Sequence, residues 1–101
     1  MLVTVLVTVT GAGVYVGAAV LARHRAQAAA DLAALAAAAR IPAGAETACA
    51  QARRIAVSMR AALRGCDVDG LDVAVAVTVG TGLRFTGEAR AAARAGPVDP
   101  G

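Results

Sequence analysis

The chain has 101 residues, enough for one small domain, and its sequence is 58% hydrophobic but only 2% aromatic. The net charge of +3 rests on ten arginines and no lysine, and the arginines are spread from Arg23 to Arg94. A nucleic-acid surface would combine clustered cations with stacking aromatics. With only Tyr15 and Phe85 available, the composition argues against that class of partner.

Residues 1–22 contain no charged side chain, and we expect them to form a transmembrane anchor. A helix of this length is roughly 30 Å long, enough to cross the hydrocarbon core of a bilayer. Gly13 and Gly17 lie four residues apart, the spacing that lets another membrane helix approach closely. Simple tolerance of glycine on a lipid-facing surface explains the same pair equally well.

A cleaved signal peptide is the rival interpretation of this segment. It would need a basic region before the apolar run and a small-residue cleavage site, and Val20-Leu21-Ala22 is a poor one. Orientation is contested, because Arg23, His24 and Arg25 follow the span and the positive-inside rule would leave the rest of the chain in the cytoplasm. Two cysteines instead suit an oxidising compartment.

The helix is expected to continue through residues 23–40, an Ala-rich stretch with no Gly or Pro before Pro42. Two stripes are predicted on it. The polar one carries Arg23, Gln27 and Asp31, and the apolar one carries His24, Ala28, Leu32, Leu35 and Ala39. His24 has no ligand partner nearby, so we interpret it as an interfacial packing residue.

A second helix is predicted after Pro42 from the spacing of its apolar residues. One face carries Cys49, Ala52, Ala56 and Met59, and the other carries Gln51, Arg53, Arg54, Ser58 and Arg60. Met59 is therefore interpreted as a core residue.

A half-buried strand is predicted next, because Leu71, Val73, Val75, Val77 and Val79 alternate with smaller or polar residues. Asp69-Gly70 predicts a two-residue hairpin turn that pairs Val68 with Leu71 and Cys66 with Val73. Cys66 and Val68 would then share the valine face. Gly80-Thr81-Gly82 predicts a further turn, residues 83–95 are compatible with a helix or a third strand, and residues 96–101 are expected to be a flexible tail.

The two cysteines, Cys49 and Cys66, are compatible with a disulfide or with two buried thiols. If the second helix ran to Arg64, the cysteines would be roughly 20 Å apart, too far for a bridge. If the helix ended near Arg60 and a strand began near Leu63, the chain would return Cys66 to the level of Cys49. Gly65 favours the later end, so the residues leave both alternatives open.

The segments GAAVLARHRAQAAADLAALAAAARIPAG, CDVDGLDVAVAV and ARAAARAGPV resemble the small TadE-like proteins of high-GC Gram-positive bacteria. These proteins belong to the TadE/TadG-like group associated with Flp (tight-adherence) pilus and secretion loci. The resemblance implies an N-in anchor, a pilin-like domain outside the cell, a strand near Cys66 and a role in assembly. Members usually carry a polar or basic stretch before the apolar run, and it is missing here.

No sequence motif points to an enzyme, a cofactor or a metal site, and Asp67, Asp69 and Asp72 are interpreted as turn residues. We therefore expect an α+β protein: a transmembrane helix (1–22), a pilin-like extracytoplasmic domain (23–95) with a long helix, a second helix and an antiparallel sheet, and a tail (96–101). The predicted function is that of a non-enzymatic minor pilin or pseudopilin whose partners are the membrane and other assembly subunits, without a nucleic acid or small-molecule substrate. The alternative is a secreted adhesin or effector released by signal cleavage.

Overall fold

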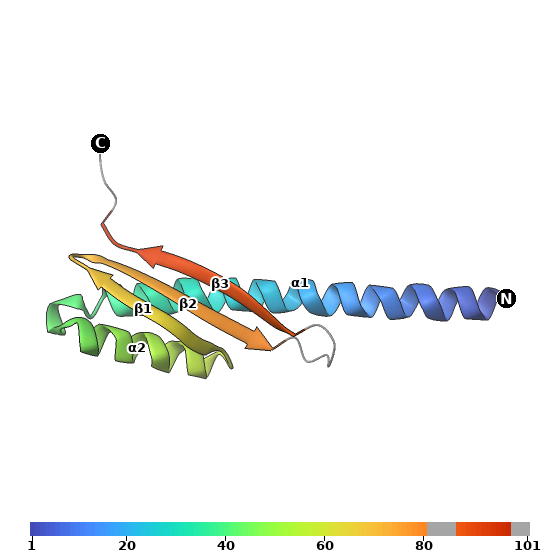
Figure 1. Cartoon of the computed structure of the whole chain (residues 1–101), viewed down its shortest axis with the longest axis horizontal. Helices are drawn as coiled ribbons and strands as arrows, with labels where there is room; N and C mark the ends of the chain where they lie inside the picture. Colours follow the sequence, from blue (N-terminus) through green and yellow to red (C-terminus); the bar gives the residue numbers. More distant parts are fainter. Residues whose placement is uncertain (81–86, 98–101) are drawn as a thin grey trace.

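The computed structural model describes residues 1–80 and 87–97, and within them the chain forms two long helices followed by a sheet (Figure 1). The helical part comprises α1 (Leu2–Ala38), the short 3-10 helix η1 (Ile41–Ala43) and α2 (Ala45–Ser58). The strands are β1 (Ala62–Asp69), β2 (Asp72–Gly80) and β3 (Glu88–Ala95), in spatial order β1-β2-β3 with both pairs antiparallel. The predicted α+β fold is confirmed.

The two helices cover one face of the sheet (Figure 1). α1 contacts β2 and β3, α2 contacts β1, and the helices contact each other. The valines at alternate positions of β2 point into this layer, and Val73 and Val77 are completely buried there. The domain is therefore a two-layer sandwich with one core.

α1 is one uninterrupted helix, as predicted, and its N-terminal half extends beyond the domain (Figure 1). At a rise of 1.5 Å per residue its length is about 55 Å, which accounts for most of the 63 Å long dimension of the molecule. The helix ends before Pro42, which occupies the first turn of η1, a position where its missing N–H is not needed.

The predicted apolar stripe of α1 is not its buried face, and this prediction is wrong. The residues of α1 that meet the core are all alanines: Ala22, Ala26, Ala29, Ala30, Ala33, Ala34 and Ala37. Leu32 and Leu35, by contrast, are 49% and 62% exposed. Alanines on α1 and at Ala48, Ala52 and Ala56 of α2 allow the backbones to approach closely, whereas leucines at those positions would force the layers apart.

The hairpin between β1 and β2 turns one residue later than predicted. Asp69 pairs with Asp72, so the turn residues are Gly70 and Leu71, and Cys66 pairs with Val75 instead of Val73. Gly70, the first residue of the turn, has φ 63°. This is the left-handed conformation that such a turn requires, and glycine adopts it at little cost.

This correction moves the register by two residues, and an even shift leaves the residues that remain in the two strands on their predicted faces. Val68 pairs with Val73 instead of Leu71, and both Val68 and Cys66 still pack against the valine core. Leu71, predicted to lie on the valine face, sits in the turn and is exposed.

The end of α2 decides between the two alternatives that the sequence leaves open. α2 ends at Ser58, and Arg60 takes the left-handed conformation with φ 58°. The Arg60 N–H donates to the Val57 carbonyl at 3.0 Å and the Ala61 N–H donates to the Ala56 carbonyl at 2.9 Å, which is the Schellman pattern of a helix C-terminus. The early end is therefore correct, although a non-glycine residue in this conformation costs about 1–2 kcal/mol.

Gly65 has a different role from the one that favoured a longer helix. It lies in β1 where the pairing with β2 shifts between Leu63 and Gly65, so that Arg64 is an extra residue. Such a bulge lets both Leu63 and Cys66 pack against the core despite their odd spacing.

The segment that was compatible with either helix or strand forms β3 over residues 88–95, while residues 83–86 lie outside the described part of the chain. β3 pairs with β2 from Val73–Ala95 to Gly80–Glu88, and its two buried residues are Ala89 and Ala95. Pairing and burial override the helical propensity of its alanines. Of the predicted tail, Gly96 and Pro97 are exposed; residues 98–101, like the predicted turn residues Thr81 and Gly82, are not described.

Candidate functional site

The most unusual surface of the protein is the N-terminal half of α1. Residues 1–17 are all exposed, and the large apolar residues between Met1 and Leu21 are each at least 44% exposed. Soluble monomers rarely leave so much continuous apolar surface uncovered. Within the described residues α1 is the one helix long and apolar enough to cross a membrane. This half needs a cover of lipid or of other apolar helices.

Gly13 and Gly17, the pair singled out for helix packing, lie on this projecting segment. A Cβ atom added to either glycine would meet no atom within 4 Å. The pair therefore makes no close contact within the described part of the chain. Nearby, the Thr8 hydroxyl donates to the Thr4 carbonyl at 2.8 Å, so this polar group is satisfied within the helix itself.

Cys49 and Cys66 form a disulfide between α2 and β1, with their Cα atoms 5.8 Å apart. The early end of α2 makes this possible, because β1 runs back along the helix and returns the second cysteine to the level of the first. Both residues are half-buried, and Cys66 packs against the hydrophobic core. The bond closes the segment that contains the helix end and the start of the sheet.

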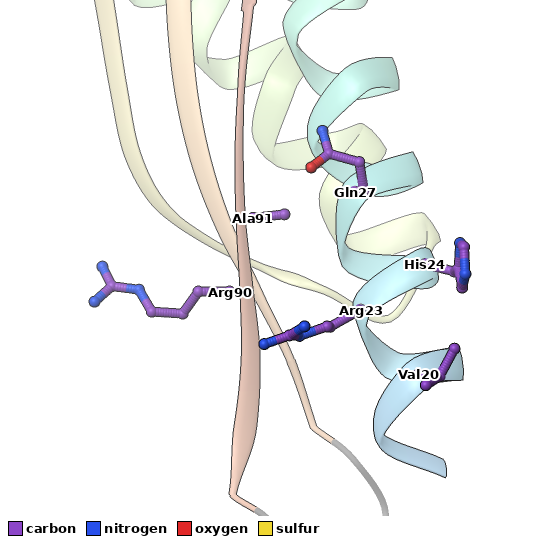
Figure 2. Close-up of a pocket in the computed structure, with 6 residues that line it drawn as sticks. All are labelled: Val20, Arg23, His24, Gln27, Arg90 and Ala91. Atoms are coloured by element: carbon purple, nitrogen blue, oxygen red, sulfur yellow. The ribbon is translucent and has the colours of Figure 1, made fainter. Parts of the chain in front are cut away.

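A cleft of about 510 Å³ lies between α1 and β3, at the end of the domain from which the apolar helix projects (Figure 2). It is lined by Val20, Arg23, His24, Gln27, Arg90 and Ala91. The Gln27 side-chain amide donates to Asp31 Oδ1 at 2.9 Å and to the Ala92 carbonyl at 3.4 Å, which ties α1 to the outer edge of β3. The sequence could not predict that Arg23 and Arg90 lie at the same end of the domain, because this depends on the placement of β3.

The described residues contain no group of three or more His, Cys, Asp or Glu side chains able to hold a metal ion. Asp67 and Asp69 are exposed and Asp72 is half-buried around the hairpin turn, and His24 is exposed on α1. The cleft beside His24 is open to solvent and holds no acid–base pair. These residues thus present a charged surface without a recognisable catalytic arrangement.

Fold and surface together define a class: a small α+β domain, linked by a disulfide, on an apolar N-terminal helix. Residues 1–40 match the family model Tad, described as "Putative Flp pilus-assembly TadE/G-like". The match covers α1 and confirms the resemblance predicted from the sequence.

The chain is also similar to the protein named "Apoptosis inhibitor Rv3654c" of Mycobacterium tuberculosis (strain ATCC 25618 / H37Rv), with 62% identity over 52 residues. The alignment covers 52% of this chain and 62% of the relative, so it spans less than two thirds of that protein. No solved structure matches the chain.

Proposed function

We propose that this chain is a non-enzymatic, single-pass membrane protein of the minor-pilin type that acts in Flp pilus assembly or the associated secretion. The proposal rests on two features that fall on the same helix. The match to the pilus-assembly family covers residues 1–40, and this is the helix whose N-terminal half has no cover within the domain. We assign residues 1–22 to the anchor, 23–95 to the pilin-like domain and 96–101 to the tail.

The domain is proposed to lie outside the cytoplasm. The positive-inside rule opposes this, since Arg23, His24 and Arg25 follow the span. The disulfide supports it, because such bonds persist in oxidising compartments and a small alanine-rich core depends on a covalent link. Access of protease to a C-terminal tag on intact cells tests the orientation.

The anchor is proposed to bind other subunits through Gly13 and Gly17. Four-residue spacing places both on one side of the helix, and their open surroundings let a neighbouring backbone approach closely. A second copy of the chain is the simplest partner with a matching helix. In this proposal α1 has two packing surfaces. Its buried alanines pack against the rest of the domain, and its two glycines pack against another subunit.

We expect the double substitution Gly13→Leu and Gly17→Leu to lower self-association in bilayers severalfold, because leucine side chains would separate the two backbones. Energy transfer between fluorophores fused to the N-terminus of the full-length chain measures this. Gly11→Leu is the matched control, since residues two apart face different sides of a helix. Equal losses in both variants, or no self-association of the unsubstituted chain, would contradict the packing proposal.

A second candidate function is a secreted effector released by cleavage after the apolar segment. The name of the mycobacterial relative favours it, because "Apoptosis inhibitor" describes an inhibitory activity and not a part of a pilus. Release would remove residues 1–22, only part of the segment 1–40 that matches the pilus-assembly family. The length of the species that cells retain therefore separates the two functions.

A further inference from the structure

The charges of the domain are separated along its long axis. The end nearest the projecting half of α1 is formed by the start of β1, the end of β2 and the start of β3 (Figure 1). Thr78 pairs there with Ala62 on one side and Arg90 on the other, and α1 contributes Arg23 and Arg25 immediately after its charge-free run. We call Arg23, Arg25 and Arg90 the basic collar.

The acidic groups gather at the other end of the sheet. Asp69 and Asp72 pair beside the hairpin turn, and Asp67 lies two residues before Asp69 on the same strand. Arg94 is the neighbouring cation at that end, because it pairs with Ala74, which also pairs with Asp67. Of the arginines on the described strands, Arg64 and Arg90 lie at the end nearest the projecting half of α1 and Arg94 lies at the other end. Three of the four carboxylates on these strands, Asp67, Asp69 and Asp72, lie at the hairpin end, and Glu88 is the exception.

The collar side chains are exposed and lack carboxylate partners among residues 1–80 and 87–97. The one ion pair in this part of the chain joins Arg64 Nη2 and Glu88 Oε1 at 3.5 Å, and the Nε of Arg64 also donates to Thr78 Oγ1 at 3.0 Å. Figure 2 shows Arg23 extending from α1 toward β3 while Arg90 points away from the opposite side of that strand. Free guanidinium groups thus lie on both sides of the first residues of β3.

We propose that the basic collar binds the phosphate groups of anionic phospholipids at the surface of the bilayer that α1 spans. The proposal rests on the proposed membrane anchoring, which sets the collar at headgroup level because Arg23 directly follows the charge-free run. Guanidinium groups bind phosphate oxygens in a fixed two-pronged geometry, and an anionic surface attracts cations within about 10 Å. Arg90 is far from Arg23 in the sequence, and the fold brings it to the same headgroup level.

The collar would also fix the tilt of the domain on its anchor. Cations on α1 alone would attract the helix without orienting the sheet, whereas Arg90 attaches the sheet side to the same surface. The acidic hairpin end then faces away from the membrane, where like charges would otherwise be repelled. The interaction thus sets which face of the domain is presented to other subunits.

The test uses the full-length chain in nanodiscs of equal parts phosphatidylglycerol and phosphatidylcholine, with native mass spectrometry of the lipids that stay bound after release. We expect preferential retention of phosphatidylglycerol, falling about fivefold for each arginine removed in Arg23→Gln with Arg90→Gln. The control pair Arg40→Gln with Arg94→Gln has the same charge change away from the collar and should leave the preference intact. Inorganic phosphate added to discs of phosphatidylcholine alone should show no saturable binding.

Equal losses in the collar and control pairs would overturn the proposal, as would no preference in the unsubstituted chain or saturable binding of free phosphate. Preferential binding of an added oligonucleotide over phosphatidylglycerol would assign the collar to a different partner and also overturn it. Resistance of the disc-bound chain to alkaline extraction is measured in parallel. A chain that inserts without lipid preference refutes only the collar, whereas a chain that fails to insert refutes the membrane anchoring on which it rests.

Discussion

Reduction of the Cys49–Cys66 bond should remove about 3 kcal/mol from the stability of the domain, according to the chain-entropy estimate for a loop of this size. A domain with so small a core is expected to hold only about 3–5 kcal/mol in total. The corresponding fall in the thermal unfolding midpoint is roughly 12–24 °C. The loss should appear first in β1 and β2, since the bond attaches this hairpin to α2.

Amide hydrogen exchange measured by mass spectrometry, with and without reductant, follows this loss in the full-length chain in micelles. The double variant Cys49→Ala with Cys66→Ala should behave like the reduced protein and be insensitive to reductant. Slow exchange that persists in β1 and β2 after reduction would contradict the assigned role. Two freely alkylated thiols in protein isolated without reductant would show that the bond does not form in the cell.

Substitution of Ala33 by Leu should destabilise the domain by about 1–3 kcal/mol, because a larger side chain cannot enter the close contact that α1 makes with the rest of the core. Ala33 is completely buried, whereas Ala28 is exposed on the same helix. Ala28→Leu is therefore a control with the same change in helix propensity, and it should have little effect.

Because the buried face of α1 is made of alanines, truncation of Leu35 should have a small effect. Truncation to Ala usually costs about 2–5 kcal/mol in a core, but Leu35 is 62% exposed and Leu35→Ala should cost far less. Denaturant unfolding of the three variants in micelles compares them directly. If Leu35→Ala proved more damaging than Ala33→Leu, the originally predicted apolar stripe would be the true core face.

The parts of the fold that were predictable are those in which the sequence contrasts two faces. Val73, Val75, Val77 and Val79 alternate with smaller or polar residues, so the strand and its inner face could be read directly. α1 offers no such contrast, because apolar alanines lie on every side of it. The predicted stripe followed the two leucines because they are larger than the alanines. The face was decided by how closely the layers pack, a property of the assembled domain.

Two chain reversals were predicted less well, for local reasons. Asp69-Gly70-Leu71 accommodates a turn at either of two positions, and glycine favours both. Arg60 carries no sequence signal for a helix end, yet it adopts the left-handed conformation because the strand must begin at once to reach the core. The helical propensity of residues 88–95 was overridden in the same way by pairing with β2.

The candidate sites also differ in whether local sequence features or tertiary placement creates them. The charge-free run and the Gly13–Gly17 pair are local features and could be found in the sequence. The basic collar could not, because the helix and the sheet each supply part of it and only the fold brings Arg90 to the end at which Arg23 lies. Tertiary placement, not motif, creates this surface.

Anchoring by α1, with the domain outside the cytoplasm, is the central claim, and a single experiment on the full-length chain with a C-terminal tag measures both parts. Membranes from intact, protease-treated cells are extracted with alkaline carbonate, and the retained chain is sized. We predict that the retained species resists carbonate and still includes residues 1–22, and that protease removes its tag without lysis of the cells. A soluble species that begins near Arg23, or a membrane species whose tag is cut only after lysis, would contradict this account.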